Sequence, residues 1–204
     1  MTPAVSAVLF DLDGVIRHWD DAGTRAGEAA AGLPPGAIER VAYDVPEFAL
    51  AQVGQVTAAE WGAAIGRALV AAHGPGAEVA AELFMAHTGV LDIAMVELVA
   101  AVRQHVTVAL LSNATDQLRA HLAHHELTEA FDLVLCSAEL GVAKPDPGIF
   151  RHAATVLGRK PAECFFTDDR PENVDGARAA GLRAAVFTTR DGLVTDLRGL
   201  GLPL

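Results

Sequence analysis

The sequence predicts an α/β fold, a doubly wound, Rossmann-like parallel sheet with a small α-helical cap inserted into it. Three observations predict this fold. The apolar run Val5–Phe10 stands near the start of the chain, and further short apolar runs alternate with helical segments from Asp92 onward. Unbroken apolar runs indicate strands that are buried on both faces, as in a parallel sheet covered by helices. Between these parts lies the alanine-rich stretch Ile16–His87, in which no strand is expected.

The inserted stretch has apolar side chains three and four positions apart, which is the spacing of amphipathic helices. We expect helices near Ala22–Ala31, Ala37–Tyr43, Phe48–Val53, Thr57–Ala72 and Ala77–His87. The best-marked helix start is Thr57, because Thr57 and Glu60 match a capping box. The predicted organisation is therefore a discontinuous α/β core, residues 1–15 and 88–204, with a helical cap at residues 16–87.

The second part of the core alternates helices with strands. In order, we expect helix Ile93–Gln104, strand Val106–Leu111, helix Asp116–Glu126, strand Phe131–Cys136, helix Pro147–Leu157, strand Glu163–Thr167, helix Pro171–Ala180, strand Arg183–Phe187 and helix Asp191–Arg198. Ligands of such sheets bind beyond the carboxyl ends of the strands. Polar side chains should therefore be sought where each strand ends.

Composition narrows the class of protein. With 204 residues, 51% of them hydrophobic and 20% charged, the chain suits one globular domain with a modest insertion. The net charge of −11 argues against a nucleic-acid-binding surface. No apolar run has the length of a membrane span or the flanks of a signal peptide, so we expect no membrane partner. The two cysteines, Cys136 and Cys164, form no CxxC pair, which favours free thiols in the cytoplasm over a disulfide.

Polar residues do collect at the predicted strand ends. They are Asp11 and Asp13 after the first strand, Ser112 and Asn113 after the second, Lys144 in the loop after the third, and Asp168 and Asp169 after the fourth. Asp11 and Asp13 are two residues apart, so an extended chain would point both to one side. Two acids at the end of a buried strand are costly unless a cation lies between them. Each group alone could be a turn or a helix cap, but four in this order indicate a site.

This set of motifs resembles the haloacid dehalogenase superfamily of hydrolases. The motifs are Asp11-Leu12-Asp13-Gly14-Val15, Leu110-Leu111-Ser112-Asn113-Ala114, Lys144-Pro145-Asp146 and Phe166-Thr167-Asp168-Asp169-Arg170-Pro171-Glu172-Asn173-Val174. The resemblance covers roughly Val5–Val15 and Asp92–Phe187, and it implies that the insertion is the family's small cap between the first two motifs. The paired acids of the last motif are similar to those of the phosphatase-rich branch of the family.

The resemblance, together with the chemistry of these side chains, implies a role for each. Asp11 would attack phosphorus and form an aspartyl-phosphate. Asp13 would protonate the leaving oxygen and then activate water. Mg²⁺ would be held by Asp11, the main-chain carbonyl of Asp13, and the pair Asp168 and Asp169, with the direct ligand of that pair left open. Ser112, the amide groups of Asn113, and Lys144 would hold the phosphate oxygens.

The expected function is that of a Mg²⁺-dependent phosphatase acting on a small phosphorylated metabolite, such as a sugar phosphate. A phosphomutase with the same residues and a non-hydrolytic phosphate-binding or phospho-acceptor protein stay open as alternatives. The acid at Asp13 argues against the second alternative, and also against a dehalogenase, since dehalogenases of the family carry a non-acidic residue there. The oligomeric state is not predicted.

Several further residues admit two interpretations. His121, His124 and His125 share one predicted helical face, where a solvated surface is favoured over a metal site. Substrate contact and a hinge or packing role are both open for Arg17, His18 and Trp19. Packing within the helical bundle is favoured over substrate specificity for Tyr43, Glu47, Phe48 and Trp61.

Overall fold

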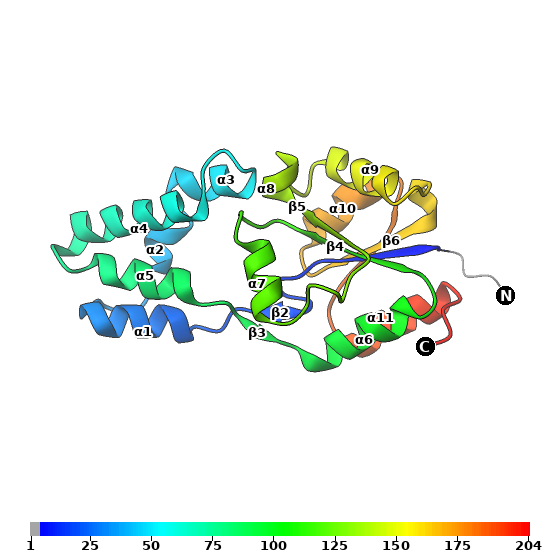
Figure 1. Ribbon diagram of the computed structural model, residues 1–204, viewed down its shortest axis with the longest axis horizontal. Coiled ribbons are helices and arrows are strands. Elements are labelled where there is room, and N and C mark those ends of the chain that lie inside the picture. Colours follow the sequence, from blue (N-terminus) through cyan, green and yellow to red (C-terminus); the bar gives the residue numbers. More distant parts are fainter. Residues whose placement is uncertain (1–4) are drawn as a thin grey trace.

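Five parallel strands form the central sheet of this computed structural model, which describes residues 5–204 (Figure 1). They are β1 (Ala7–Phe10), β4 (Thr107–Ser112), β5 (Leu133–Cys136), β6 (Cys164–Asp168) and β7 (Arg183–Val186). Their order is β5-β4-β1-β6-β7, and every pairing is parallel. The predicted parallel α/β fold is therefore confirmed, with β1 at the centre of the sheet. Met1–Ala4, the first residues of the predicted core, lie outside the described residues.

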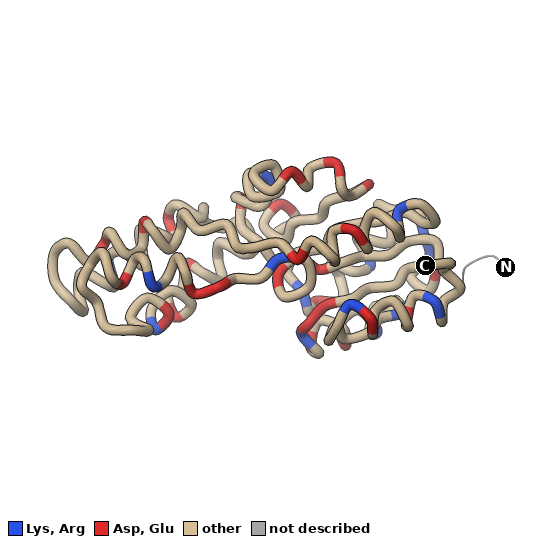
Figure 2. The backbone as a smooth tube through the Cα atoms, turned by 90° about the horizontal axis from the view of Figure 1, so that it is seen from below, with Lys and Arg blue, Asp and Glu red and all other residues tan. Residues whose placement is uncertain are grey.

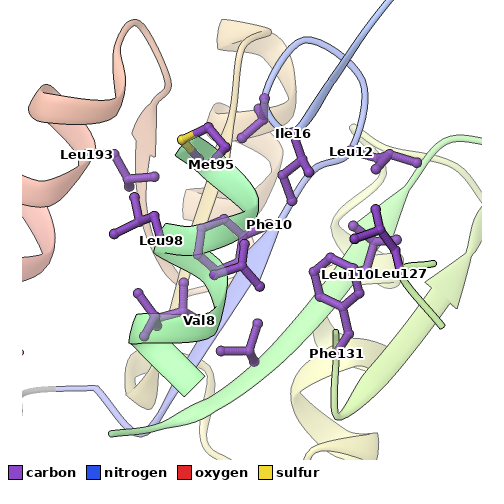
Figure 3. Packing of buried hydrophobic residues seen from close by; sticks show 14 of the residues in the cluster. Val8, Phe10, Leu12, Ile16, Met95, Leu98, Leu110, Leu127, Phe131 and Leu193 are labelled. Carbon is purple, nitrogen blue, oxygen red and sulfur yellow. The ribbon is translucent and has the colours of Figure 1, made fainter. Parts of the chain in front are cut away.

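Helices cover both faces of this sheet. One face packs against α6 (Ile93–Arg103), α7 (Leu118–His124) and α11 (Arg190–Gly199), and the other against α9 (Pro147–Val156) and α10 (Pro171–Ala179). Figure 3 shows Val8 and Phe10 of β1 beside Met95 and Leu98 of α6 and Leu193 of α11.

The intervening β1 residues Ala7 and Leu9 belong to the opposite cluster, with Phe150 of α9. Alternate residues of one strand thus supply both cores, which explains why the strand reads as an unbroken apolar run.

A separate group of helices follows β1 in the chain and lies beyond one end of the sheet (Figure 1). These helices, here called the helical part, are α1 (Ala22–Ala31), α2 (Glu39–Ala42), α3 (Pro46–Gln52), α4 (Ala58–His73) and α5 (Glu78–Ala86). They bury a core of their own, which includes Ile38, Ile65, Leu69 and Ala80. The predicted capping box is confirmed, since Glu60 N donates to Thr57 Oγ1 at 3.1 Å and Thr57 N donates to Glu60 Oε2 at 2.7 Å.

Two short strands join the helical part to the sheet. β2 (Arg17–His18) and β3 (Val90–Leu91) pair antiparallel, with Arg17 opposite Leu91. The expectation of no strand within residues 16–87 is therefore wrong at β2. A strand of two residues has no measurable period, and its partner lies on the far side of the insertion, so local sequence could not reveal it.

Two short helical turns were also not predicted, α8 (Ser137–Leu140) and η1 (Pro161–Glu163). Both are shorter than the spacing over which an apolar period can be recognised. The predicted helix Asp116–Glu126 begins later and ends earlier than expected, at Leu118 and His124. Such shifts at the ends of elements leave the topology unchanged.

Charged residues are spread along both parts of the described chain (Figure 2), and Asp and Glu are more numerous than Lys and Arg. Within residues 5–204, none of the helices combines the length and the apolar character needed to cross a membrane.

Candidate active site

A buried lysine joins two carboxylates at the carboxyl edge of the sheet. Asp11 follows β1 directly, and Asp168 ends β6, the neighbouring strand. Lys144 Nζ lies 2.7 Å from Asp11 Oδ1 and 2.6 Å from Asp168 Oδ2, and its side chain is only 1% exposed. The two acids at the end of β1 were expected to need a nearby cation. Lys144, from the loop before α9, supplies one to Asp11.

The carboxyl group of Asp11 lies in an environment that disfavours its negative charge. Burial raises the pKa of Asp11 to about 7, against the opposing effect of Lys144, while the negative charge of Asp168 raises it further. Burial disfavours an anion that water no longer solvates. The site therefore accommodates more positive charge than Lys144 alone provides.

The two acids of the last motif lie in different environments. Asp168 is fully buried, and its oxygens accept hydrogen bonds from Lys144 Nζ at 2.6 Å, from Asn173 Nδ2 at 3.0 Å and from Arg170 N at 2.9 Å. Asp169 is exposed. Asp168 is therefore engaged in orienting Lys144, whereas the carboxylate of Asp169 remains accessible to a ligand.

Carboxylate oxygens of Asp11, Asp168 and Asp169 lie within 4.8 Å of one another. Oxygen donors without nitrogen or sulfur are the ligands that Mg²⁺ prefers, so these residues fit that ion. Gly14 makes the arrangement possible, because its φ is +86° and a Cβ atom there would lie 2.3 Å from Asp169 Oδ2. The expected metal ligand of Asp13 is its main-chain carbonyl, and the side chain of Asp13 is not a member of this group.

Asp13 is instead held by the segment that follows it. Arg17 Nε donates to Asp13 Oδ1 at 2.7 Å, Arg17 Nη2 donates to Oδ2 at 3.0 Å, and Trp19 Nε1 donates to Oδ1 at 2.9 Å. Arg17 is 3% exposed, and its guanidinium lies 4.5 Å from the centre of the Trp19 ring. Arg17 and Trp19, whose roles the sequence left open, thus contact the expected acid of the site directly.

His121 completes this contact chain. Its Nδ1 lies 3.1 Å from Arg17 Nη1, and burial, followed by the charge of Arg17, lowers the pKa of His121 to about 4. A neutral ring can accept the hydrogen bond from Arg17. His125 Nε2 lies 2.9 Å from Thr88 O. The solvated-face interpretation is therefore wrong for these two half-buried histidines, because their partners come from distant segments; it holds for exposed His124.

Ser112 and Asn113, which are expected to bind phosphate, differ in whether their side chains already form hydrogen bonds. Ser112 Oγ is buried beside the cavity and has no hydrogen-bond partner among residues 5–204. Asn113 Oδ1 accepts from Lys144 N and Asn113 Nδ2 donates to Lys144 O, both at 2.8 Å. The side chain of Asn113 therefore holds the backbone of Lys144, which the sequence did not indicate. The hydroxyl of Ser112, in contrast, is available to form a hydrogen bond with a ligand.

These groups open into a cavity of about 630 Å³ between the sheet edge and the helical part. The predicted residues that line it are Asp11, Asp13, Ser112, Asn113, Lys144 and Asp169. Aromatic side chains line it as well, namely Trp19, Tyr43, Phe48, Trp61 and Phe84. Phe84 was missed because an apolar residue on a helix indicates packing. Trp61 does pack against the helical core, as expected, but it also faces this cavity.

Comparison with known proteins gives consistent matches. The family described as haloacid dehalogenase-like hydrolase matches residues 5–181. Phosphatase MT3486 of Mycobacterium tuberculosis (strain CDC 1551 / Oshkosh) is 33% identical, over 97% of this chain and 96% of its own. Phosphoserine phosphatase of Thermus thermophilus is 43% identical over 40% of this chain and 34% of its own. A HAD family enzyme of Bacteroides thetaiotaomicron, solved as a magnesium complex, shares the fold, with a TM-score of 0.74 and 22% identity over 94% of this chain and 98% of that one.

Proposed function

Because this chain belongs to the haloacid dehalogenase-like hydrolases, we propose that it is a cytoplasmic, Mg²⁺-dependent phosphatase that hydrolyses a small phosphomonoester through an aspartyl-phosphate on Asp11. The observation that carries the proposal is the shared contact of Lys144 with Asp11 and Asp168, beside the accessible carboxylate of Asp169. A phosphoryl group is attacked by a carboxylate only where positive charge offsets its own oxygens. The partner proposed is a small phosphorylated metabolite, and neither nucleic acid nor a membrane.

The proposed reaction has two displacement steps at phosphorus. First, an oxygen of Asp11 bonds to phosphorus while the bond from phosphorus to the alcohol oxygen breaks, and Asp13 gives its proton to that oxygen. Water then attacks the phosphorus of the aspartyl-phosphate and passes a proton to Asp13. Inorganic phosphate leaves, and the carboxylate of Asp11 is restored.

Asp13 must change its contacts for this proton transfer. Both of its oxygens accept hydrogen bonds from Arg17, and Oδ1 also accepts one from Trp19. A carboxylate with these donors is held as an acceptor, so at least one contact has to give way before Asp13 can carry a proton to the alcohol oxygen. We therefore propose that Arg17 and Trp19 position Asp13 between turnovers.

The remaining residues would bind the phosphoryl oxygens and the ion. The unpartnered hydroxyl of Ser112, the backbone of Asn113 and Lys144 would receive the phosphoryl oxygens. Asp11, the main-chain carbonyl of Asp13 and Asp169 would hold Mg²⁺, while Asp168 keeps Lys144 in place. When bound, the ion would offset negative charge on the phosphoryl group and on Asp11.

The test is the replacement of the proposed nucleophile. Asp11→Asn should lower phosphate release from an aryl phosphate in the presence of Mg²⁺ by about a thousandfold or more, since an amide cannot form the acyl phosphate. Asp175→Asn, an equivalent change at an exposed position of α10, is the matched control and should keep full activity. Chelation of the wild-type protein should stop turnover, and added Mg²⁺ should restore it.

The outcomes separate the proposal from its alternatives. Wild-type turnover by Asp11→Asn, with native circular dichroism, would exclude Asp11 as the nucleophile. A phosphomutase would convert a phosphate ester into its isomer without releasing phosphate. A phospho-acceptor protein would become labelled at Asp11 and remain so for minutes after excess donor is removed. Either result would replace hydrolysis as the function of the site.

A further inference from the structure

The helical side of the cavity is a ring of aromatic side chains. Tyr43 lies 5.2 Å from Phe48, Phe48 lies 5.2 Å from Trp61, Trp61 lies 6.2 Å from Phe84, and Phe84 lies 6.4 Å from Tyr43, measured between ring centroids. All four line the cavity that contains Asp11. They come from α3, α4, α5 and the residue after α2, so the fold of the helical part brings them together.

This chain has few aromatic residues, and its tryptophans and its tyrosine all line the cavity. Aromatic side chains make up 5% of the sequence, with two Trp residues and one Tyr. Both tryptophans, Trp19 and Trp61, and the tyrosine, Tyr43, line the cavity. Chance placement would scatter such rare side chains over the molecule, so their common location indicates a use in the cavity.

The aromatic ring is not the core of the helical part. That core consists of fully buried aliphatic residues such as Ile65 and Leu69. The aromatic side chains lie at its border: Phe48, Trp61 and Phe84 are half-buried, and Tyr43 is 53% exposed. When a ligand covers apolar surface beside a polar site, the removal of that surface from water favours binding by roughly 25 cal/mol per Å².

The polar atom of Trp61 is already satisfied, because its Nε1 donates to Ala42 O at 2.8 Å. This indole therefore has only apolar ring surface to offer a ligand. An aromatic group would find edge or face contacts with the surrounding rings, which add to the gain from burial.

Charge on this side of the cavity disfavours a second anionic group on the substrate. Residues 22–86 contain three cationic side chains, Arg25, Arg40 and Arg67, and none lines the cavity. They contact Asp21, Pro35 O and Glu47 instead. The carboxylates that line the cavity near the helices are those of Asp20, Asp21 and Glu39, and His87, which also lines it, lies 3.1 Å from Asp20 Oδ1. The two arginines that do line the cavity, Arg17 and Arg170, are already paired with Asp13 and Glu172. A carboxylate or second phosphate on the alcohol would therefore meet negative charge without an unpaired arginine to offset it.

We propose that Tyr43, Phe48, Trp61 and Phe84 form the subsite for the leaving alcohol, and that this alcohol is uncharged and aromatic. The inference rests on the proposed function, since it names the class of phosphomonoester on which Asp11 acts. It also departs from the sugar phosphate suggested from sequence, because three of the four rings, Phe48, Phe84 and Trp61, offer the hydroxyl groups of a sugar no free hydrogen-bond partner. The cavity, at about 630 Å³, has the size of pockets that bind such molecules.

The test compares esters with leaving alcohols of similar acidity. Phosphate release with Mg²⁺ is measured for phenethyl phosphate, glycerol phosphate and a hexose phosphate esterified at its primary hydroxyl. We expect kcat/KM for phenethyl phosphate to exceed the other two by about tenfold or more. Phe48→Ala should reduce this preference, whereas Phe48→Leu should retain part of it. Leu83→Ala, at a 39% exposed position of α5 that does not line the cavity, is the matched control.

A binding measurement separates the subsite from the chemistry. Both tryptophans line the cavity, so their fluorescence should respond to phenylpropyl phosphonate, which cannot be hydrolysed, at about tenfold lower concentration than to propyl phosphonate. A preference for the hexose ester would overturn the aromatic subsite and leave the phosphatase intact. If no ester releases phosphate, the proposed function fails, and the binding measurement alone tests the aromatic subsite. Tighter binding of phenylpropyl phosphonate than of propyl phosphonate then supports the subsite, and equal binding overturns it.

Discussion

Among the single residues of the site, Lys144 determines most of its arrangement. Its ammonium group contacts two carboxylates at 2.6 and 2.7 Å, and its backbone is held on both sides by the amide of Asn113. A compact ammonium fits this closed space, whereas the planar, forked guanidinium of arginine would need a wider one. The chain thus uses a lysine where a point charge between two acids is required.

Gly14 determines where the carboxylate of Asp169 can lie. Its positive φ of +86° already disfavours other residues, and a Cβ atom would come 2.3 Å from Asp169 Oδ2. We predict that Gly14→Ala displaces Asp169 and raises the Mg²⁺ concentration needed for half-maximal phosphatase activity by about tenfold to a hundredfold. Titration of activity with Mg²⁺ measures this change.

Gly158→Ala is the control for the backbone effect. Gly158 also has a positive φ, +65°, but a Cβ atom there would meet open space. Both variants should lose about 1–2 kcal/mol of unfolding free energy through the left-handed backbone. An unchanged Mg²⁺ dependence in Gly14→Ala would show that Asp169 does not depend on this glycine.

Sequence located the polar residues of the site because each follows an apolar strand, and parallel strands end at one edge. It could not show that Asp13 pairs with Arg17, or that His121 lies half-buried against Arg17. These contacts join the start of the insertion to α7, across 104 positions in the case of Arg17 and His121. Local spacing contains no information on such pairs.

Among the elements, α1 and α5 approach each other through glycine. A Cβ atom on Gly27 of α1 would lie 2.7 Å from Ala80 O of α5 and 3.0 Å from Ile38 Cδ1. We predict that Gly27→Ala destabilises the helical part by about 1–2 kcal/mol, because overpacking against backbone outweighs the higher helix propensity of alanine. Chemical denaturation followed by the fluorescence of Trp61 in α4 measures the loss.

Gly199→Ala provides the matched control in a helix without a close neighbour. Gly199 is the last residue of α11, and a Cβ atom there would have nothing within 4 Å. This variant should be neutral or gain up to about 1 kcal/mol of stability. Equal gains in both variants would mean that α1 and α5 can separate without cost.

Helices and strands were predictable from sequence where they were long enough to show an apolar period or formed an unbroken apolar run. Ala22–Ala31 was expected as a helix and is α1, and each strand of the parallel sheet was expected from its apolar run. β2 and β3 were not, because each has two residues and exists only through pairing with the other. Secondary structure that depends on a distant partner is the part of this fold that sequence alone leaves out.

On the scale of the whole molecule, the cavity lies between two independently packed parts. The sheet has cores on both faces, and the helical part has its own. The groups proposed to bind phosphate belong to the sheet edge, whereas Tyr43, Phe48, Trp61 and Phe84 belong to the helical part. This division would let the alcohol subsite vary between relatives while the reacting groups stay fixed on the sheet.

The two cysteines can report whether the sheet opens as one unit. Cys136 on β5 and Cys164 on β6 are free and buried, in the clusters on opposite faces of the sheet. Burial raises the pKa of both thiols, that of Cys164 to about 11. Thiolate is the reactive form, and it is favoured only above the pKa, so at pH 8 a shift from 9 to about 11 reduces the thiolate of Cys164 about a hundredfold.

We therefore predict that both cysteines react with iodoacetamide only through global unfolding, at the same rate. Mass spectrometry of peptides labelled over time measures each site separately, and a destabilising concentration of urea should accelerate both equally. The reason is structural: Cys136 is buried under the helices on one face of the sheet and Cys164 under those on the other, so exposing both requires both helical layers to separate from the sheet. Faster labelling of Cys136 alone would instead show that the β5 edge opens while the central strands, and with them the position of Asp11, stay in place.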